Sequence, residues 1–134
     1  MVHVLNIKTT KRNDFIDITD DLLRLIKKEK FDDGIIVLFV PHTTAGLIVN
    51  EHYDPDVISD IKESLNAVLD VVQTRVSFKH REGNSDAHFK TALVNNSLSL
   101  LVENNQLVLG TWQRILFLDF DGPRNRKIRI STQI

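Results

Sequence analysis

The sequence predicts an α+β protein in which two mostly antiparallel sheets pack together with about three helices. The chain has 134 residues, of which 42% are hydrophobic and 26% charged, as in a globular domain. Short apolar segments of strand length alternate with segments of helical periodicity, and no repeat or linker divides them. We therefore expect residues 1–134 to form one domain with seven or eight strands.

Four strands and two helices are expected in the N-terminal half. The strands are residues 2–7, 15–18, 35–40 and 47–49, and a turn at 11–13 makes the first two a hairpin. Thr19 or Asp20 caps the first helix, which ends by residues 32–34. Asp54 and Pro55 begin the second helix. The apolar faces of the two helices are Leu22, Leu25 and Ile26, and Val57, Ile61, Leu65 and Val68.

The C-terminal half predicts one helix and up to five strands. Residues 71–78 favour a strand, and a helix follows Asn84 to about Asn95. Residues 98–102 and 106–109 form a hairpin turned at 103–105. The last strands are residues 112–120 and 127–132, joined by a turn at 121–123.

Two of these strands are apolar on both faces, at residues 35–40 and 115–118. About three helices cannot cover every such face, so the sheets must pack on each other, on a second subunit, or on both. We favour both. The alternative is a monomeric sandwich whose central strands account for the whole pattern.

Composition excludes several classes of protein. No apolar run approaches the ~18 residues of a membrane span. The start of the chain lacks the pattern of a signal peptide, so we expect a cytoplasmic protein. Basic residues are scattered without an aromatic ladder, which argues against nucleic acid. Without cysteine, any metal must be held by His, Asp, Glu or water.

The polar stretch at residues 80–88 is the first candidate site. Gly83 makes one continuous helix through His80 and His88 unfavourable, so His80 should end an extended segment. Asn84 or Ser85 then caps a helix whose positive end attracts oxyanions. The alternative is an ordinary capped helix with two surface histidines.

Three further polar motifs accompany this stretch. Residues 41–46 carry His42 and Thr43, and Glu51 follows the next strand as a candidate metal ligand or general base. Residues 110–113 contain Trp112 and Gln113, where the indole offers a flat wall, although such a tryptophan is usually core. The turn at 121–126 projects Arg124 and Arg126, whose planar guanidinium groups suit phosphate. The basic surplus lies in this half: residues 71–134 hold 9 Lys/Arg against 5 Asp/Glu, and residues 1–70 hold 8 against 13.

Together these motifs resemble the YjbQ-like family. The resemblance runs from about Phe15 to Ile130 and includes the motifs at residues 42–45, 50–51, 110–113 and 122–126, Asp60, and the set His80, Asn84, Ala87 and His88. It implies a two-sheet α+β fold that assembles as a trimer around a threefold axis. It also implies secondary thiamine-phosphate synthase activity, in which a pyrimidine diphosphate is joined to a thiazole phosphate and pyrophosphate is released.

The resemblance also implies the site residues. His42, Asn84, His88 and Glu51 would be catalytic, and Thr43, Trp112, Gln113, Arg124 and Arg126 would bind the substrate. His42, His80 and His88 are the candidate metal ligands. Three imidazoles favour a zinc- or nickel-like ion, whereas the synthase reaction is usually helped by magnesium, which prefers oxygen. The histidines therefore hold either a metal or the phosphates directly.

Two other functions fit the same residues. One is a metal-dependent phosphoester hydrolase, with Glu51 as the general base for a metal-bound water. The other is a non-catalytic trimer that binds a phosphorylated metabolite and regulates a partner. All three functions place a negatively charged small molecule in one polar cavity.

Overall fold

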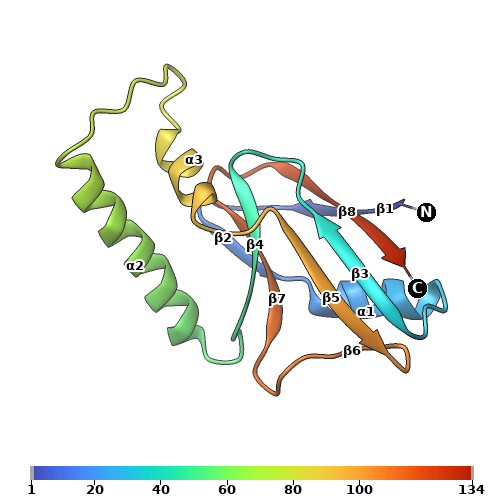
Figure 1. Ribbon diagram of the computed structural model, residues 1–134. Coiled ribbons are helices and arrows are strands. Elements are labelled where there is room, and N and C mark those ends of the chain that lie inside the picture. Colours follow the sequence, from blue (N-terminus) through green and yellow to red (C-terminus); the bar gives the residue numbers. More distant parts are fainter. Residues whose placement is uncertain (1, 134) are drawn as a thin grey trace.

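The computed structural model describes residues 2–133, which form eight strands and three helices (Figure 1). In chain order these are β1 (Val2–Lys8), β2 (Asp14–Asp17), α1 (Thr19–Lys28), β3 (Gly34–Phe39), β4 (Ala45–Asn50), α2 (Pro55–Gln73), α3 (Ser85–Ala92), β5 (Ser97–Glu103), β6 (Gln106–Leu107), β7 (Arg114–Asp119) and β8 (Asn125–Gln133). One sheet has the order β1-β8-β3-β5-β6 and the other β2-β7-β4, and every pairing is antiparallel. The α+β class with two antiparallel sheets and three helices is confirmed.

The larger core lies between the two sheets. The five-stranded sheet contributes Ile36, Leu38 and Ile128, and the three-stranded sheet contributes Ile115 and Phe117. Helix α1 closes this core with one apolar face, because residues spaced three and four apart lie on the same side of a helix. Those α1 residues are Leu22 and Ile26, together with the partly buried Leu25.

A second core covers the other face of the three-stranded sheet. Leu116 and Leu118 of β7 point into it, where Ile58 of α2 and Ala87 of α3 pack against them. Figure 1 shows α2 and α3 together on the β4 side of the molecule, with α1 on the other side. Strand β7 is thus buried on both faces, as its apolar run predicts.

The outer face of the five-stranded sheet is apolar but not covered within the chain. Ile35 and Phe39 of β3 are each 45% exposed, and Leu101 of β5 is 59% exposed. The expectation that residues 35–40 are buried on both faces is therefore wrong for the single chain. Only alternate residues, Ile36, Leu38 and Val40, are fully buried in the core.

The hairpin expected between the first two strands does not form. Strand β1 pairs instead with β8, with Val2 opposite Ser131 and Lys8 opposite Asn125. Strand β2 pairs with β7 in the other sheet. The turn at residues 11–13 therefore carries the chain from one sheet to the other, a long-range choice that local turn chemistry does not encode.

Three expected helix features also differ. Thr19 and Asp20 lie inside α1, whose N-cap is Ile18, and the Asp17 carboxylate accepts the Thr19 N–H at 3.0 Å. Helix α2 extends to Gln73, so the strand expected at residues 71–78 is absent, and Ile58 and Leu69 are its buried residues. Helix α3 ends at Ala92, before Asn95. The expected apolar face of α2 is therefore confirmed in part: Ile61 and Leu65 pack against the second core, whereas Val68 is exposed.

The hairpin of β5 and β6 is confirmed. Asn104 and Asn105 form its turn with φ values of 51° and 63°, a left-handed conformation that asparagine tolerates better than most residues. The last strand begins earlier than expected, at Asn125. Trp112 lies before β7 in a turn rather than in the strand. Within residues 2–133, no helix combines the length and apolar character needed to cross a membrane.

Gly46 of β4 is a site where this packing can be tested. An added Cβ atom would lie 2.5 Å from Val94 Cγ2 and 2.8 Å from the Asn95 carbonyl oxygen. We predict that Gly46→Ala lowers the free energy of unfolding by about 1–3 kcal/mol, measured by urea denaturation. Gly110→Ala is the control, because its Cβ would meet only the Gln113 side chain, at 3.2 Å or more. Equal stability of the two variants would contradict the close approach.

Candidate functional site

Three segments that are distant in sequence meet at one open cavity of about 430 Å³. They are residues 41–44 after β3, residues 80–88 before and within α3, and residues 121–126, which run from the end of β7 into the start of β8. The segments bring together most of the residues proposed from the sequence. These are His42, Thr43, His80, Asn84, His88, Arg124 and Arg126.

A buried ion pair beside this cavity holds two of the segments in place. The Arg126 guanidinium donates to both carboxylate oxygens of Asp119, at 3.0 and 2.7 Å, and to Thr44 Oγ1 at 2.7 Å. Thr9 Oγ1 donates to the same carboxylate at 2.7 Å. Burial alone would raise the pKa of Asp119, but the hydrogen bonds from Arg126, the Asp121 N–H and Thr9 lower it below its ordinary value. Arg126 therefore acts chiefly as a positioning residue.

Asp121 connects the second and third segments. Its Oδ2 accepts hydrogen bonds from Asn84 Nδ2 at 2.9 Å and from Arg124 Nη2 at 3.0 Å. The pKa of Asp121 is lowered, because these hydrogen bonds outweigh its burial. Arg124 also donates through Nε to the Asp121 carbonyl oxygen at 2.8 Å, yet its side chain is 53% exposed. One edge of this guanidinium is thus anchored while the group stays accessible to a ligand.

Asn84 has a different role from the one expected. It is the N-cap residue of α3, but its side chain makes no capping hydrogen bond and donates instead to Asp121. Its Oδ1 atom is buried without a hydrogen-bond partner in the described part of the chain. The start of α3 therefore lacks a capping side chain from Asn84, and its first N–H groups carry the partial positive charge of a helix N-terminus.

His42 is held as a neutral imidazole. Its Nε2 accepts the backbone N–H of Lys127 at 3.1 Å, so this nitrogen carries no proton and the neutral ring carries its proton on Nδ1. Burial, followed by the nearby Arg126 charge, lowers the pKa of His42. His42 can therefore offer a hydrogen-bond donor to an anion through Nδ1–H.

The other two histidines contact each other. The rings of His80 and His88 meet edge to face, with centroids 5.2 Å apart. His88 lies in the first turn of α3, and its N–H donates to the Asn84 carbonyl oxygen. His80 precedes the turn at Gly83, whose φ of 74° is unfavourable for other residues. The contact between the two imidazoles agrees with their assignment to one site in the sequence.

The donor arrangement does not match the metal site proposed from the sequence. Within residues 2–133, no group of three or more His, Asp or Glu side chains is placed to hold a metal ion. The Nε2 lone pair of His42 is already used by Lys127, and a protonated Nδ1 cannot bind a metal. The Asp121 carboxylate is used by Asn84 and Arg124. In this arrangement His42 is placed to donate a hydrogen bond to an anion.

Three of the proposed residues lie elsewhere in the chain. Glu51 follows β4 and Trp112 and Gln113 precede β7, whereas the cavity lies before β4 and after β7. The paired strands have six residues each, so about 20 Å separates the two ends. Trp112 is 62% exposed and contacts Tyr53 edge to face. Within one chain, these three residues do not line the cavity.

Some residues of the site were not identified from the sequence. Asp119 and Asp121 position Arg126 and Arg124, and Thr9, which follows β1, donates a hydrogen bond to Asp119. A carboxylate at the end of the apolar run 115–120 was an available signal, because a buried aspartate requires a partner. The contribution of Thr9 depends on the pairing of β1 with β8 and has no local signal.

The fold and the cavity define a class of two-sheet α+β proteins with a polar cavity at the start of α3. The model of the family described as UPF0047 protein YjbQ-like matches residues 3–133. The UPF0047 protein MJ1081 of Methanocaldococcus jannaschii is 43% identical over 130 residues, covering 97% of this chain and 92% of that protein. YugU of Bacillus subtilis is 42% identical over 126 residues, covering 94% of each chain.

Solved structures agree with these sequence matches. A crystal structure of a YjbQ/UPF0047 family protein from Clostridium acetobutylicum has a TM-score of 0.90 and 42% identity, covering 98% of this chain and 99% of that one. The chain therefore belongs to the YjbQ-like UPF0047 family.

The two arginines should respond differently to substitution. Arg126→Gln leaves the buried Asp119 carboxylate without its partner, so we predict a loss of about 3–5 kcal/mol in the free energy of unfolding. Arg124→Gln removes a half-exposed side chain, so we predict a loss below about 1 kcal/mol. Urea denaturation of both variants measures the difference. Equal losses would contradict the positioning role of Arg126.

The cost of Arg126→Gln should depend on pH. Because the folded-state pKa of Asp119 is lowered, its stabilising contribution is complete above its unfolded pKa of about 3.9 and is lost as pH falls through the folded value. We predict that the stability difference between the wild-type protein and Arg126→Gln is large at pH 7 and narrows as the pH falls below about 4, where the Asp119 carboxyl of the wild-type protein becomes protonated. Denaturation at pH 7, at about pH 4 and at about pH 2.5 tests this. A constant difference would exclude Asp119 as the titrating partner.

Proposed function

We propose that the protein is a transferase of the thiamine-phosphate synthase type. It joins a pyrimidine diphosphate to a thiazole phosphate and releases pyrophosphate. The observation that supports this proposal is the convergence of His42, His88, Arg124 and the start of α3 in one cavity. The resemblance of the motifs to the YjbQ-like family supports the particular reaction.

The reaction places specific demands on the cavity. The bond between the pyrimidine methylene carbon and the diphosphate oxygen breaks, and its electron pair leaves with pyrophosphate. The thiazole nitrogen then forms the new carbon–nitrogen bond. Negative charge grows on the departing oxygens, so hydrogen-bond donors placed around them lower the barrier. Arg124, the first N–H groups of α3 and the Nδ1–H of His42 supply such donors.

The cavity would bind the diphosphate through hydrogen-bond donors that are already in position, rather than through a large net positive charge. Arg124 and Arg126 are each paired with an aspartate, so most of their charge is balanced. Their orientation is fixed by those same aspartates, which lowers the cost of ordering them around a ligand. Thr43 and His88 add hydrogen-bonding groups at the same cavity.

The metal requirement is part of the proposal. Magnesium would reduce the charge on the diphosphate, and the three-histidine alternative would instead use a zinc- or nickel-like ion. The test is turnover after EDTA treatment, followed by addition of each ion. Recovery with magnesium supports magnesium, and recovery only with zinc or nickel supports the histidine site.

Substitutions in the cavity should reduce turnover. We predict that His88→Ala and Arg124→Gln each lower kcat/KM for thiamine phosphate formation by about 10- to 100-fold, because each removes a group that meets the diphosphate. His52→Ala and Arg75→Gln are the matched controls, because both residues are exposed and outside the cavity. Product formation is measured by chromatography, and pyrophosphate release by a coupled assay.

The same assays separate the alternatives. Release of phosphate from generic phosphoesters without the joined product would support a hydrolase, although Glu51 does not line the cavity within one chain. Binding of phosphorylated compounds without turnover would support a non-catalytic protein. If turnover is unchanged in both His88→Ala and Arg124→Gln, this cavity is not the catalytic site.

We further propose that the protein assembles as a homotrimer through the outer face of the five-stranded sheet. Val2, Val4, Ile35, Phe39 and Leu101 leave an apolar surface that packing against other copies would cover. We predict that Leu101→Asp converts the trimer to monomers in sedimentation analysis, because it places a charge in that interface. Val71→Asp, at an exposed position on α2, is the control. A wild-type monomer would contradict this proposal.

A further inference from the structure

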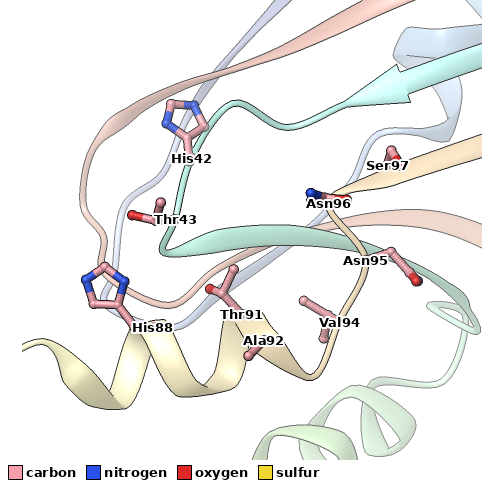
Figure 2. Close-up of a pocket in the computed structure, with 9 residues that line it drawn as sticks. All are labelled: His42, Thr43, His88, Thr91, Ala92, Val94, Asn95, Asn96 and Ser97. Carbon is pink, nitrogen blue, oxygen red and sulfur yellow. The ribbon is translucent and has the colours of Figure 1, made fainter.

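Helix α3 also borders a cavity on a different face from the candidate functional site. Figure 2 shows His88 and Thr91 projecting from α3 toward the loop that carries His42 and Thr43. Lys90 lies between His88 and Thr91 in sequence, so helical geometry places it on another face of α3. Its ammonium group instead meets α2. The cavity beside Lys90 is therefore separate from the one that holds the histidines.

This second cavity lies where α2, α3 and β2 meet, and its volume is about 60 Å³. A water molecule takes about 30 Å³ of liquid volume, so the cavity has room for a small ion or a few water molecules. Its lining contains no Asp or Glu among the described residues. The lining combines amide, aromatic and ammonium groups, which come from Asn13, Phe15, Lys62, Asn66, Lys90 and Phe120.

Lys90 is a buried cation without a counter-ion in the chain. It is 4% exposed, and its Nζ donates to Asn66 Oδ1 at 2.6 Å and to Asn13 Oδ1 at 3.4 Å. Within residues 2–133, no carboxylate oxygen lies within 4 Å of this ammonium group. Two neutral amides do not balance its charge, and a lysine is almost never fully buried unless it is paired.

A second ammonium group borders the same cavity. Lys62 Nζ lies 5.0 Å from the centroid of the Phe15 ring, and Lys90 Nζ lies 5.9 Å from that of Phe120. The two rings contact each other edge to face, with centroids 6.1 Å apart. Aromatic faces attract ammonium groups but carry no net charge, so they do not replace an anion.

The electrostatic surroundings of the two lysines agree with this shortage of negative charge. Burial is the largest cause that lowers the pKa of Lys90, and also the largest that lowers the pKa of Lys62. Each lysine has a further cation nearby, which lowers its pKa as well. Nearby aspartates oppose the shift, but none of them forms an ion pair with either lysine in the described part of the chain.

We infer that this cavity binds one small monovalent anion, such as a halide or formate ion, through the ammonium groups of Lys90 and Lys62. The ion supplies the counter-charge that the described chain lacks at this position. Because Lys62 belongs to α2, Lys90 to α3 and Phe15 to β2, one ion fastens both helices to the three-stranded sheet. Asn66 is exposed at the edge of the cavity, so the ion exchanges with solvent. This site goes beyond the proposed function, since it shares no residue with the cavity of the histidines.

Thermal denaturation in two sodium salts tests this inference. Bromide is the probe, and gluconate is a monovalent anion too large for the cavity. We predict that the Tm of the wild-type protein is about 3–6 °C higher in 0.2 M bromide than in 0.2 M gluconate, because a ligand that binds only the folded state stabilises it. A wild-type Tm that is equal in the two salts would overturn the inference.

Two lysine variants show whether the effect comes from this cavity. Lys90→Met removes the buried ammonium group, so the difference in Tm between bromide and gluconate should disappear. Lys28→Met is the matched control, because Lys28 is exposed on α1 and lies outside the cavity, and it should keep the wild-type difference. A difference that persists in Lys90→Met would mean that bromide acts elsewhere.

Asn66→Asp keeps the test decisive even if Lys90→Met does not fold. Because Asn66 Oδ1 lies 2.6 Å from Lys90 Nζ, this change places a carboxylate where the bound anion would otherwise balance the charge. We predict a Tm in gluconate above that of the wild-type protein and a loss of the bromide effect. Gln73→Glu adds the same charge at an exposed position of α2 outside the cavity, and should keep the bromide effect. An unchanged bromide effect in Asn66→Asp would overturn the inference.

Anomalous scattering from crystals soaked in sodium bromide locates the ion directly. A bromide peak in contact with the ammonium group of Lys90 supports the site. Peaks confined to the outer surface would show an adventitious ion only and would overturn it.

Discussion

The ion pair between Asp119 and Arg126 holds together the end of the molecule that carries the cavity. Asp119 ends β7, Arg126 is the second residue of β8, Thr9 follows β1 and Thr44 precedes β4. Four chain segments from both sheets therefore meet at one fully buried carboxylate. Such a pair costs desolvation energy, so its value lies in fixing positions more than in adding stability. Here the positions it fixes are those of the loops that line the cavity.

This constraint explains the character of the site. The Asp121 N–H donates to the Asp119 carboxylate, and Asp121 in turn binds Asn84 and Arg124. The order of side chains thus extends from the buried pair outward to the groups that a ligand meets. A cavity built in this way holds its donors in place before any ligand arrives, which is what stabilisation of developing charge requires. The cavity holds these donors in place although the charge of each arginine is nearly balanced by an aspartate.

Local patterns in the sequence predicted much of the fold and part of the site. The β5–β6 hairpin, the start of α2 at Pro55 and the meeting of His80 with His88 each depend on residues close together in the chain. The predictions that were wrong concern contacts between residues far apart in the sequence. Strand β1 pairs with β8 across more than a hundred residues, and the Asn84 side chain binds Asp121 instead of capping its helix. Nothing in a local window distinguishes those partners from the nearer ones.

Glu51 and Trp112 were also assigned to the site from local sequence, but they lie at the opposite end of β4 and β7 from the cavity. Glu51 and Trp112 belong to the same set of family motifs as the cavity residues, yet the paired strands β4 and β7 keep them about 20 Å away. No loop movement shortens that distance, because β7 is buried on both faces and its core contacts would have to break. A site that used both ends of β7 would therefore have to take them from two copies of the chain. The uncovered apolar sheet face provides a surface on which such copies can pack, and oligomeric state and catalysis would then depend on the same contact.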